Sequence, residues 1–197
     1  MQREDGEQSE EKSEEKRNFN FSNFSSSLGE IDPKQVILQE ILDAKLINAA
    51  DQGDEKEVER LLREGAKVNR KSKMGSTPLH YAAMNDHLKV VRLLLAWKAK
   101  TNIKNLLGQT ALHSVFVPFK GKYHNYNVAK PKKIIRLLVK NHAEINAVNI
   151  GKTTPYFSAV LYEIDVLELL VELGAQTENS EGMLCVPEGD IERCPVQ

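Results

Sequence analysis

The chain has 197 residues, of which 41% are hydrophobic and 6% aromatic, enough for one buried core. No apolar run reaches the roughly 20 residues that a membrane span needs, and the acidic start lacks the apolar segment of a secretory signal. These features argue against a membrane or secreted protein and predict a cytoplasmic and/or nuclear location, in which Cys185 and Cys194 are free thiols.

The net charge of −1 conceals an uneven distribution. Residues 65–143 hold sixteen Lys and Arg, with Asp86 as the only acid, whereas residues 1–30 and 178–197 are both acidic. An asymmetry of this size influences which partners bind, because it steers negatively charged molecules toward the basic middle of the chain.

The N-terminal residues 1–30 are rich in Glu, Lys and Ser, a composition that predicts a disordered acidic tail. Order is expected to begin at Asp32, where Asp32-Pro33 supplies a helix cap followed by a proline at the first helical position. This pattern predicts a capping helix over residues 32–43.

After this helix, a sequence repeat of 33 residues predicts the fold. Gly75-Ser76-Thr77-Pro78-Leu79-His80 returns 33 residues later as Gly108-Gln109-Thr110-Ala111-Leu112-His113. The next step, from Thr110 to Thr154, takes 44 residues, which indicates an insertion near residues 120–130. The predicted domain spans 31–177, with repeats at 44–71, 72–104, 105–148 and 149–177, followed by an irregular acidic tail at 178–197.

Residues 74–105 resemble the ankyrin repeat, whose pattern reads G-x-T-P-L-H-x-A-A, then V-V-x-L-L-L, then G-A-x-x-N. The resemblance implies an all-α solenoid of about four helix-turn-helix repeats joined by β-turn fingers, in which His80 and His113 tie successive fingers together. Lys98 and His142 replace the glycine that ends the second helix of a repeat, so both are expected to adopt a positive φ at a cost of about 1 kcal/mol.

No arrangement typical of catalysis, cofactor binding or metal binding is visible in the sequence. Gly151-Lys152-Thr153 imitates part of a phosphate-binding loop, but Asn146 stands where that motif requires its first glycine. We therefore expect no enzyme, no catalytic residue, no cofactor and no metal site.

The fingers and the concave helix face are the expected binding surface. Its candidate residues are Arg70, Lys71, Lys73, Met74, Met84, Asn85, Lys104, Leu106, Leu107, Tyr123, Tyr126, Ile150 and Lys152. Apolar tips among cations predict another protein as partner, with an acidic or mixed acidic and apolar surface. The predicted function is that of an adaptor, scaffold or inhibitor.

Two alternatives and several questions stay open. The basic middle, with Tyr123 and Tyr126 among lysines of the insertion, also suits nucleic acid or another polyanion. Acidic tails beside an ankyrin stack also suit an IκB-like inhibitor of a transcription factor. Partner identity, oligomeric state and the role of the insertion stay open. The C-terminal end could be a true cap, a dimer surface or the end of a shortened array.

The resemblance also implies a modification. Ankyrin fingers are substrates of an asparaginyl hydroxylase that favours a leucine eight residues before its target. Asn69, Asn102 and Asn146 have Leu61, Leu94 and Leu138 at that spacing, so they are the predicted hydroxylation sites.

Overall fold

The computed structural model describes residues 32–117, 131–160 and 164–178. The chain divides into two compact units, Met1–Val36 and Ile37–Gln197. Of the first unit only the start of one helix is described, so the architecture below is that of the second. The predicted tail 1–30, the predicted insertion 120–130 and all but Glu178 of the predicted tail 178–197 lie outside the described residues.

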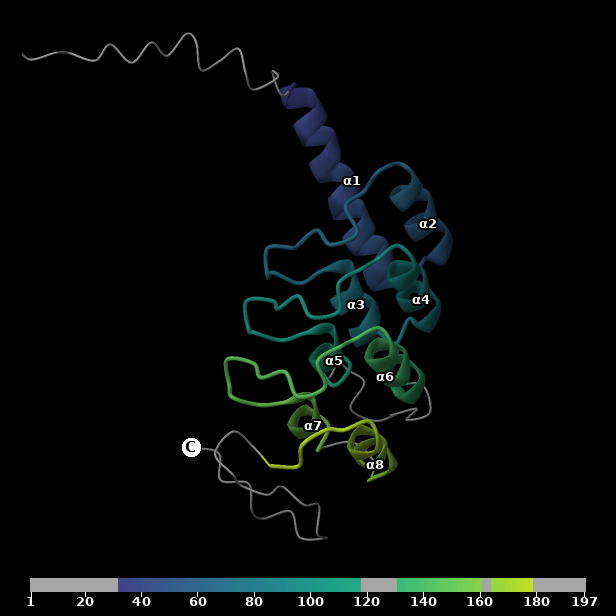
Figure 1. Cartoon of the computed structure of the whole chain (residues 1–197). Helices are drawn as coiled ribbons and strands as arrows, with labels where there is room; N and C mark the ends of the chain where they lie inside the picture. Colours follow the sequence, from purple (N-terminus) through teal and green to yellow (C-terminus); the bar gives the residue numbers. More distant parts are fainter. Residues whose placement is uncertain (1–31, 118–130, 161–163, 179–197) are drawn as a thin grey trace, which may run out of the picture. The chain divides into compact units, whose positions relative to one another are not determined.

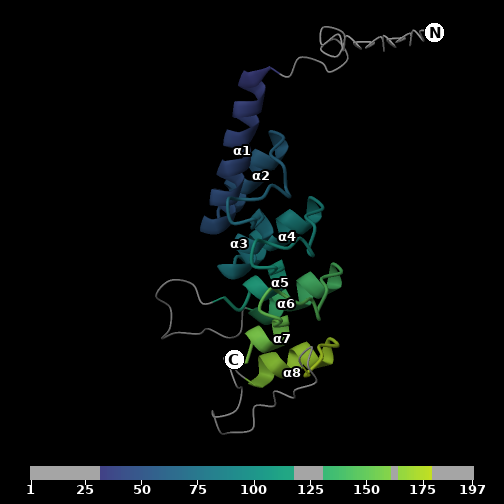
Figure 2. The same cartoon turned by 90° about the vertical axis from the view of Figure 1, so that its left-hand side faces the viewer.

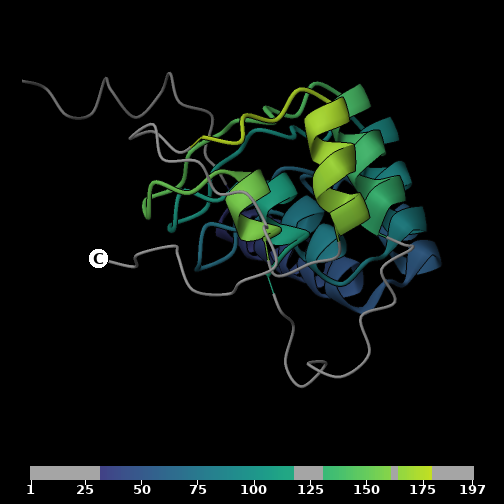
Figure 3. The same cartoon turned by 90° about the horizontal axis from the view of Figure 1, so that it is seen from below.

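The described residues form eight helices and no strand. They are α1 (Pro33–Gln52), α2 (Glu55–Arg63), α3 (Pro78–Met84), α4 (Leu88–Ala96), α5 (Ala111–Ser114), α6 (Pro131–Lys140), α7 (Pro155–Ser158) and α8 (Ile164–Glu172). The even-numbered helices stack on one another as one layer, and α3, α5 and α7 stack beside them as a second (Figures 1 and 2). The loops between repeats project together on the side away from the even-numbered helices (Figure 3). The predicted all-α repeat fold is confirmed.

The first helix of each later repeat begins at a threonine. Thr77, Thr110 and Thr154 have extended backbones with ψ near 170°, and α3 and α7 continue with Pro78 and Pro155. A cap residue followed by proline suits a helix start, since the ring fixes a helical φ and the missing N–H would have had no partner within the helix.

The core consists of the same positions in every repeat. Leu61, Leu94, Leu138 and Leu170 are equivalent residues on the even-numbered helices, and each is completely buried. Small residues such as Ala82 and Ala83 let neighbouring helices approach closely. Because each helix pair buries these side chains mainly against the pair next to it, stability comes from the stacking of neighbours.

The predicted capping helix 32–43 is not a separate element. Helix α1 runs without a break from Pro33 to Gln52 and so also supplies the first helix of the first repeat. The cause is the sequence after Pro33, which contains neither glycine nor a second proline up to Gln52. The apolar residues Ile37, Leu38 and Ile41 of its first half are exposed, whereas Leu42 is half-buried against the core.

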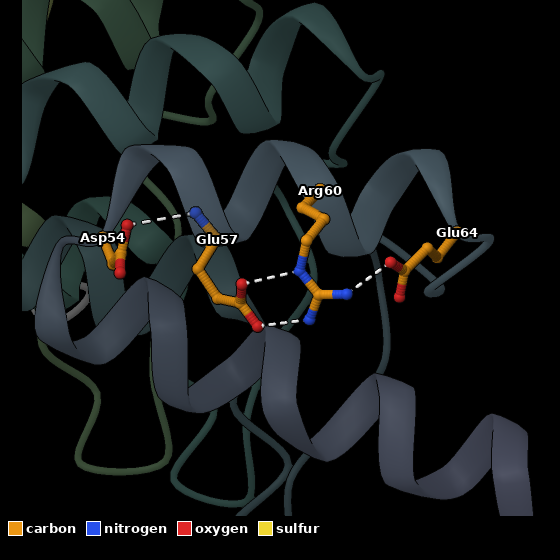
Figure 4. A network of polar contacts seen from close by, with 4 residues as sticks. All are labelled: Asp54, Glu57, Arg60 and Glu64. Atoms are coloured by element: carbon orange, nitrogen blue, oxygen red, sulfur yellow. Dashed lines mark hydrogen bonds and ion pairs between the residues drawn. The ribbon is translucent and has the colours of Figure 1, made fainter.

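Helix α2 carries a polar network on its surface (Figure 4). The guanidinium of Arg60 donates to Glu57 at 2.6 and 2.8 Å and also to Glu64, and the carboxylate of Asp54 accepts the backbone N–H of Glu57 at 3.0 Å. The hydrogen bond from Arg60 lowers the pKa of the Glu57 carboxyl. The next repeat has Val90 and Leu93 where α2 has Glu57 and Arg60. A polar face of this kind is typical of a terminal repeat.

The last helix of the stack lacks such a polar face. Val171 of α8 is 47% exposed, although its counterparts Leu62 and Leu95 are only 4% and 8% exposed. Ile164, at the start of α8, is 62% exposed. Helix α8 therefore exposes an apolar residue at a position that is buried on α2 and α4.

Substituting glycine for Lys98 or His142 is expected to stabilise the fold by up to about 1 kcal/mol each. Both residues have a φ of 63°, as predicted, where the equivalent Gly65 and Gly174 have 96° and 97°. Glycine removes the steric cost of the left-handed conformation, although its greater freedom in the unfolded chain offsets part of the gain. Urea denaturation measures the change. Lys100→Gly, at an exposed position without positive φ, is the control and should not stabilise; a gain there equal to that at Lys98 would contradict the explanation.

Candidate functional site

Three tight turns, here called the fingers, form the edge of the stack opposite the even-numbered helices. Each is closed by a hydrogen bond between its first N–H and its last C=O: Ser72 to Ser76 at 2.8 Å, Asn105 to Gln109 at 3.0 Å, and Asn149 to Thr153 at 3.1 Å. The fingers 72–76, 105–109 and 149–153 therefore have the same backbone frame and differ in their side chains.

The fingers are also joined to one another. The N–H of Leu106 donates to the carbonyl of Met74 at 3.1 Å, and the N–H of Ile150 donates to the carbonyl of Leu107 at 3.0 Å. A side chain on Gly75 or Gly108 would come within 2.9 Å of the next finger's backbone nitrogen. Glycine at these two positions lets the three fingers form one continuous hydrogen-bonded row.

Buried histidines hold this row to the helices. Nδ1 of His80 accepts the N–H of Thr77 at 3.1 Å, so Nε2 carries the proton and donates to the carbonyl of Gln109 at 3.0 Å. His113 repeats the arrangement with Thr110 and with the carbonyl of Thr153, at 3.2 and 3.1 Å. The predicted bridging role of both histidines is confirmed. Burial lowers the pKa of each imidazole below its ordinary value of 6.5, and Lys71 and Lys104 add to the effect at His80 and His113, respectively.

The stability of the protein is expected to fall as the pH drops below about 6.5. Because the folded pKa of both histidines is depressed, the unfolded chain binds protons there that the folded chain does not. The loss begins near the unfolded pKa of 6.5 and levels off below the folded pKa. Denaturation at a series of pH values measures the slope. A His80→Gln/His113→Gln variant should have a smaller slope; an unchanged slope would assign the proton uptake to other groups.

The three asparagines predicted to be hydroxylated tie each repeat to the next. Oδ1 of Asn69, Asn102 and Asn146 accepts the N–H of Lys100, Glu144 and Gln176, respectively, each at 2.8 Å. Nδ2 of Asn102 and Asn146 also donates to the carbonyls of His142 and Gly174. Hydroxylation stays a prediction, and a modifying enzyme would have to release these amides from the neighbouring repeat first.

Helix α1 reproduces the same bonds at the N-terminal end with two side chains. Oδ1 of the buried Asp43 accepts the N–H of Lys67 at 2.7 Å, and Nε2 of Gln39 donates to the carbonyl of Gly65 at 3.1 Å. Lys67 and Gly65 are the counterparts of Glu144 and His142, which Asn102 binds. Gln39 and Asp43, themselves joined at 2.8 Å, thus replace the asparagine of a preceding repeat. Sequence reasoning missed this pair.

Large apolar side chains are exposed at the tips of the fingers. Met74 is 57% exposed, Leu106 61%, Leu107 54% and Ile150 72%. All four come from neighbouring fingers of one rigid row, so the structure brings these predicted site residues together. An exposed apolar group of this kind on a rigid frame typically marks a surface that another molecule covers.

Lys71 and Lys104 lie beside these tips without acidic partners among the described residues. Nζ of Lys71 donates to the carbonyl of Lys104 at 3.2 Å, and Nζ of Lys104 donates to the carbonyl of Val148 at 2.9 Å. Within the described residues neither ammonium forms an ion pair, and Lys73 is exposed beside them. Lys152 is exposed on the third finger at a φ of 56°. Since carbonyl oxygens carry no net charge, the positive charge of Lys71 and Lys104 remains uncompensated.

Arg70 differs from these lysines. Its guanidinium lies 3.6 Å from the carboxylate of Glu40 and 3.9 Å from that of Asp43, both on α1. A hollow of about 380 Å³ next to the first finger is lined by Lys67, Asn69, Arg70 and Lys71. Arg70 therefore lines this hollow, but its charge is already balanced by two carboxylates. It attracts an acidic partner less strongly than Lys71 does.

The remaining predicted site residues are placed differently. Met84 is half-buried at the end of α3. Nδ2 of Asn85 donates to Asp51 at 2.8 and 3.1 Å, so its amide holds the end of α1. Tyr123 and Tyr126 lie outside the described residues.

Among the described residues, no three acidic, histidine or cysteine side chains gather into a metal-binding group. None of the described helices has the length and apolar character needed to span a bilayer.

Stacked helix pairs with a row of hydrogen-bonded fingers define a helical repeat protein. Residues 46–116 match the family model for ankyrin repeats (3 copies). Residues 46–116 are thus ankyrin repeats, which are in general modules that bind other proteins and are typically not enzymes. No curated protein matches the chain.

Proposed function

We propose that this protein is a non-enzymatic adaptor, scaffold or inhibitor that binds a partner protein through its fingers. The observation that carries the proposal is the row of exposed apolar tips, Met74, Leu106, Leu107 and Ile150, beside Lys71 and Lys104. Apolar anchors supply affinity once they are desolvated, and uncompensated cations select an acidic neighbour. The proposed partner therefore presents apolar side chains flanked by carboxylates.

The rigidity of the fingers supports this proposal. The fingers are bonded to one another, and the second and third are also bonded to buried histidines. A surface already held in its binding conformation loses little conformational entropy on association. The proposal places the interaction in the cytoplasm or nucleus, which microscopy of the tagged full chain tests.

Affinity capture with the full chain as bait is the direct experiment. A variant with Lys71→Glu, Lys73→Glu, Lys104→Glu and Leu106→Ala is expected to lose the captured partner by about tenfold or more, because it removes one anchor and reverses three charges. Lys34→Glu/Lys45→Glu/Lys56→Glu, which reverses three exposed charges of α1 and α2, is the control matched in charge and should capture normally. Circular dichroism checks that each variant folds.

Two outcomes would contradict the proposal. Equal capture by the finger variant and the control would move the binding surface away from the fingers. Capture that disappears after nuclease treatment would favour the alternative of nucleic-acid binding over protein binding.

A further inference from the structure

The exposed charges on the even-numbered helices form pairs between neighbouring helices at two of the three boundaries. Between α2 and α4, the carboxylate of Glu55 lies 3.7 Å from the ammonium of Lys89. Between α6 and α8, Lys132 pairs with Asp165, and the guanidinium of Arg136 lies 3.3 Å from the carboxylate of Glu172. Both boundaries thus join basic residues of the middle helices to acidic residues of the outer ones.

The boundary between α4 and α6 has no such complementarity. Here five exposed residues are all cationic, and we call them the outer cationic patch: Lys89, Arg92, Lys133, Arg136 and Lys140. The repeat places Arg92 and Arg136, 44 residues apart, at equivalent positions on adjacent helices, and likewise Lys89 and Lys133. Like charges on neighbouring helices repel each other, so this arrangement is unfavourable in the isolated protein.

The described residues offer no counter-charge for the middle of this patch. The side chains of Arg92, Lys133 and Lys140 form no ion pair with any described residue. The local sequence does not supply one either, because residues 87–143 contain neither Asp nor Glu. A carboxylate that pairs with these three residues would therefore come from a distant part of the chain or from another molecule.

We propose that the outer cationic patch binds a short acidic segment of a partner protein, which lies along α4 and α6. These helices of 9 and 10 residues are about 14–15 Å long, the length of four or five extended residues. The acids Glu55 and Glu59 on one side and Asp165, Glu168 and Glu172 on the other bound the patch. They repel a long polyanion that crosses the stack, whereas a short segment along the two middle helices avoids them. This site is separate from the fingers and goes beyond the function proposed above.

The probe is a labelled peptide of about six residues in which every second residue is Glu, with a Gln version as its neutral control. Fluorescence anisotropy with the full chain is expected to show binding of the Glu peptide only, weakened about tenfold between about 50 and 300 mM salt. An Arg92→Gln/Lys133→Gln/Lys140→Gln variant should bind about tenfold or more weakly. The matched variant Lys34→Gln/Lys45→Gln/Lys56→Gln, with the same loss of charge on exposed residues of α1 and α2, should bind normally.

Equal binding by these two variants would overturn the proposal, and a larger loss in a Lys71→Gln/Lys73→Gln/Lys104→Gln variant would assign acid binding to the fingers. Tighter binding of a short DNA duplex than of the Glu peptide, through the same residues, would replace the acidic protein segment with a nucleic acid. If a full chain with the acids of residues 1–30 changed to Gln bound the peptide tenfold more tightly, the ligand of the patch would be the protein's own tail.

Thermal unfolding gives an independent check on the charge arrangement. Arg92→Glu is expected to raise the Tm by about 1–2 °C, because attraction to Lys133 and Arg136 replaces repulsion and outweighs the new repulsion from Glu59, at the equivalent position of α2. Glu59→Arg on α2, which breaks an ion pair with Arg63, should lower the Tm. A lower Tm for Arg92→Glu would contradict the unfavourable contact between like charges on which the proposal depends.

Discussion

Replacing Gly108 with alanine is expected to destabilise the protein by about 3 kcal/mol. Two costs combine at this residue. Its φ of 71° is unfavourable for any residue with a Cβ atom, and that atom would lie 2.9 Å from the backbone nitrogen of Ile150 and 3.2 Å from the α-carbon of Asn149. Since the obstructing atoms are backbone, relief requires the second and third fingers to separate, which breaks the bond between Ile150 and Leu107.

Two other glycines separate these costs. Gly65 has a φ of 96°, but a Cβ atom added there would meet no other atom within 4 Å, so Gly65→Ala should cost about 1 kcal/mol. Gly151 has an ordinary φ, and the nearest neighbour of an added Cβ would lie at 3.4 Å, so Gly151→Ala should change stability by less than about 0.5 kcal/mol. Urea denaturation of the three variants gives the ranking. If Gly108→Ala cost no more than Gly65→Ala, the close approach of the fingers would be wrong.

The fold could be predicted because each repeat contains the residues that its local structure needs. Thr77-Pro78 starts a helix, Leu94 fills the core and Gly75 permits the finger turn, and the recurrence of such residues every 33 positions predicts a stack. The same repeat shows that Gly151 stands one residue before the position that Gly75 and Gly108 occupy in their fingers. The consequence of this displacement is that Lys152, not a glycine, takes the positive φ on the third finger.

The N-terminal end could not be predicted by this reasoning. Gln39 and Asp43 lie four residues apart on a helix, yet together they make the bonds that one asparagine makes in later repeats. No residue type recurs between the two arrangements, so a periodic pattern does not reveal them. The continuity of α1 was missed for a related reason, because a helix cap predicts where a helix starts and not where it ends.

The candidate site was predicted in its apolar part more fully than in its charged part. Exposed tips such as Leu106 follow from their place in the finger. Whether a polar side chain already has a partner depends on residues distant in sequence: the Arg70 guanidinium lies near Glu40 and Asp43, and the neutral amide of Asn85 donates to Asp51. The outer cationic patch was likewise hidden, since only the stacking of α4 on α6 sets its residues side by side.

Replacing His113 with phenylalanine is expected to destabilise the protein by about 2–3 kcal/mol. The imidazole is completely buried, accepts the N–H of Thr110 and donates to the carbonyl of Thr153. Phenylalanine keeps the bulk of the side chain, as Phe157 does at the equivalent place in the fourth repeat. The cost therefore reports the two lost hydrogen bonds and the polar groups left buried without partners, not a cavity.

The reciprocal variant Phe157→His is the control. Among the described residues no finger follows the fourth repeat, so a histidine there has no carbonyl of a next finger to bind. It would also lose the edge-on contact between the rings of Phe157 and Tyr156, whose centroids are 6.0 Å apart. Phe157→His should thus be neutral or destabilising by up to about 1.5 kcal/mol. Equal stability of wild type and His113→Phe would show that packing alone holds the finger row to the helices, and the buried histidines would then lose the bridging role assigned to them.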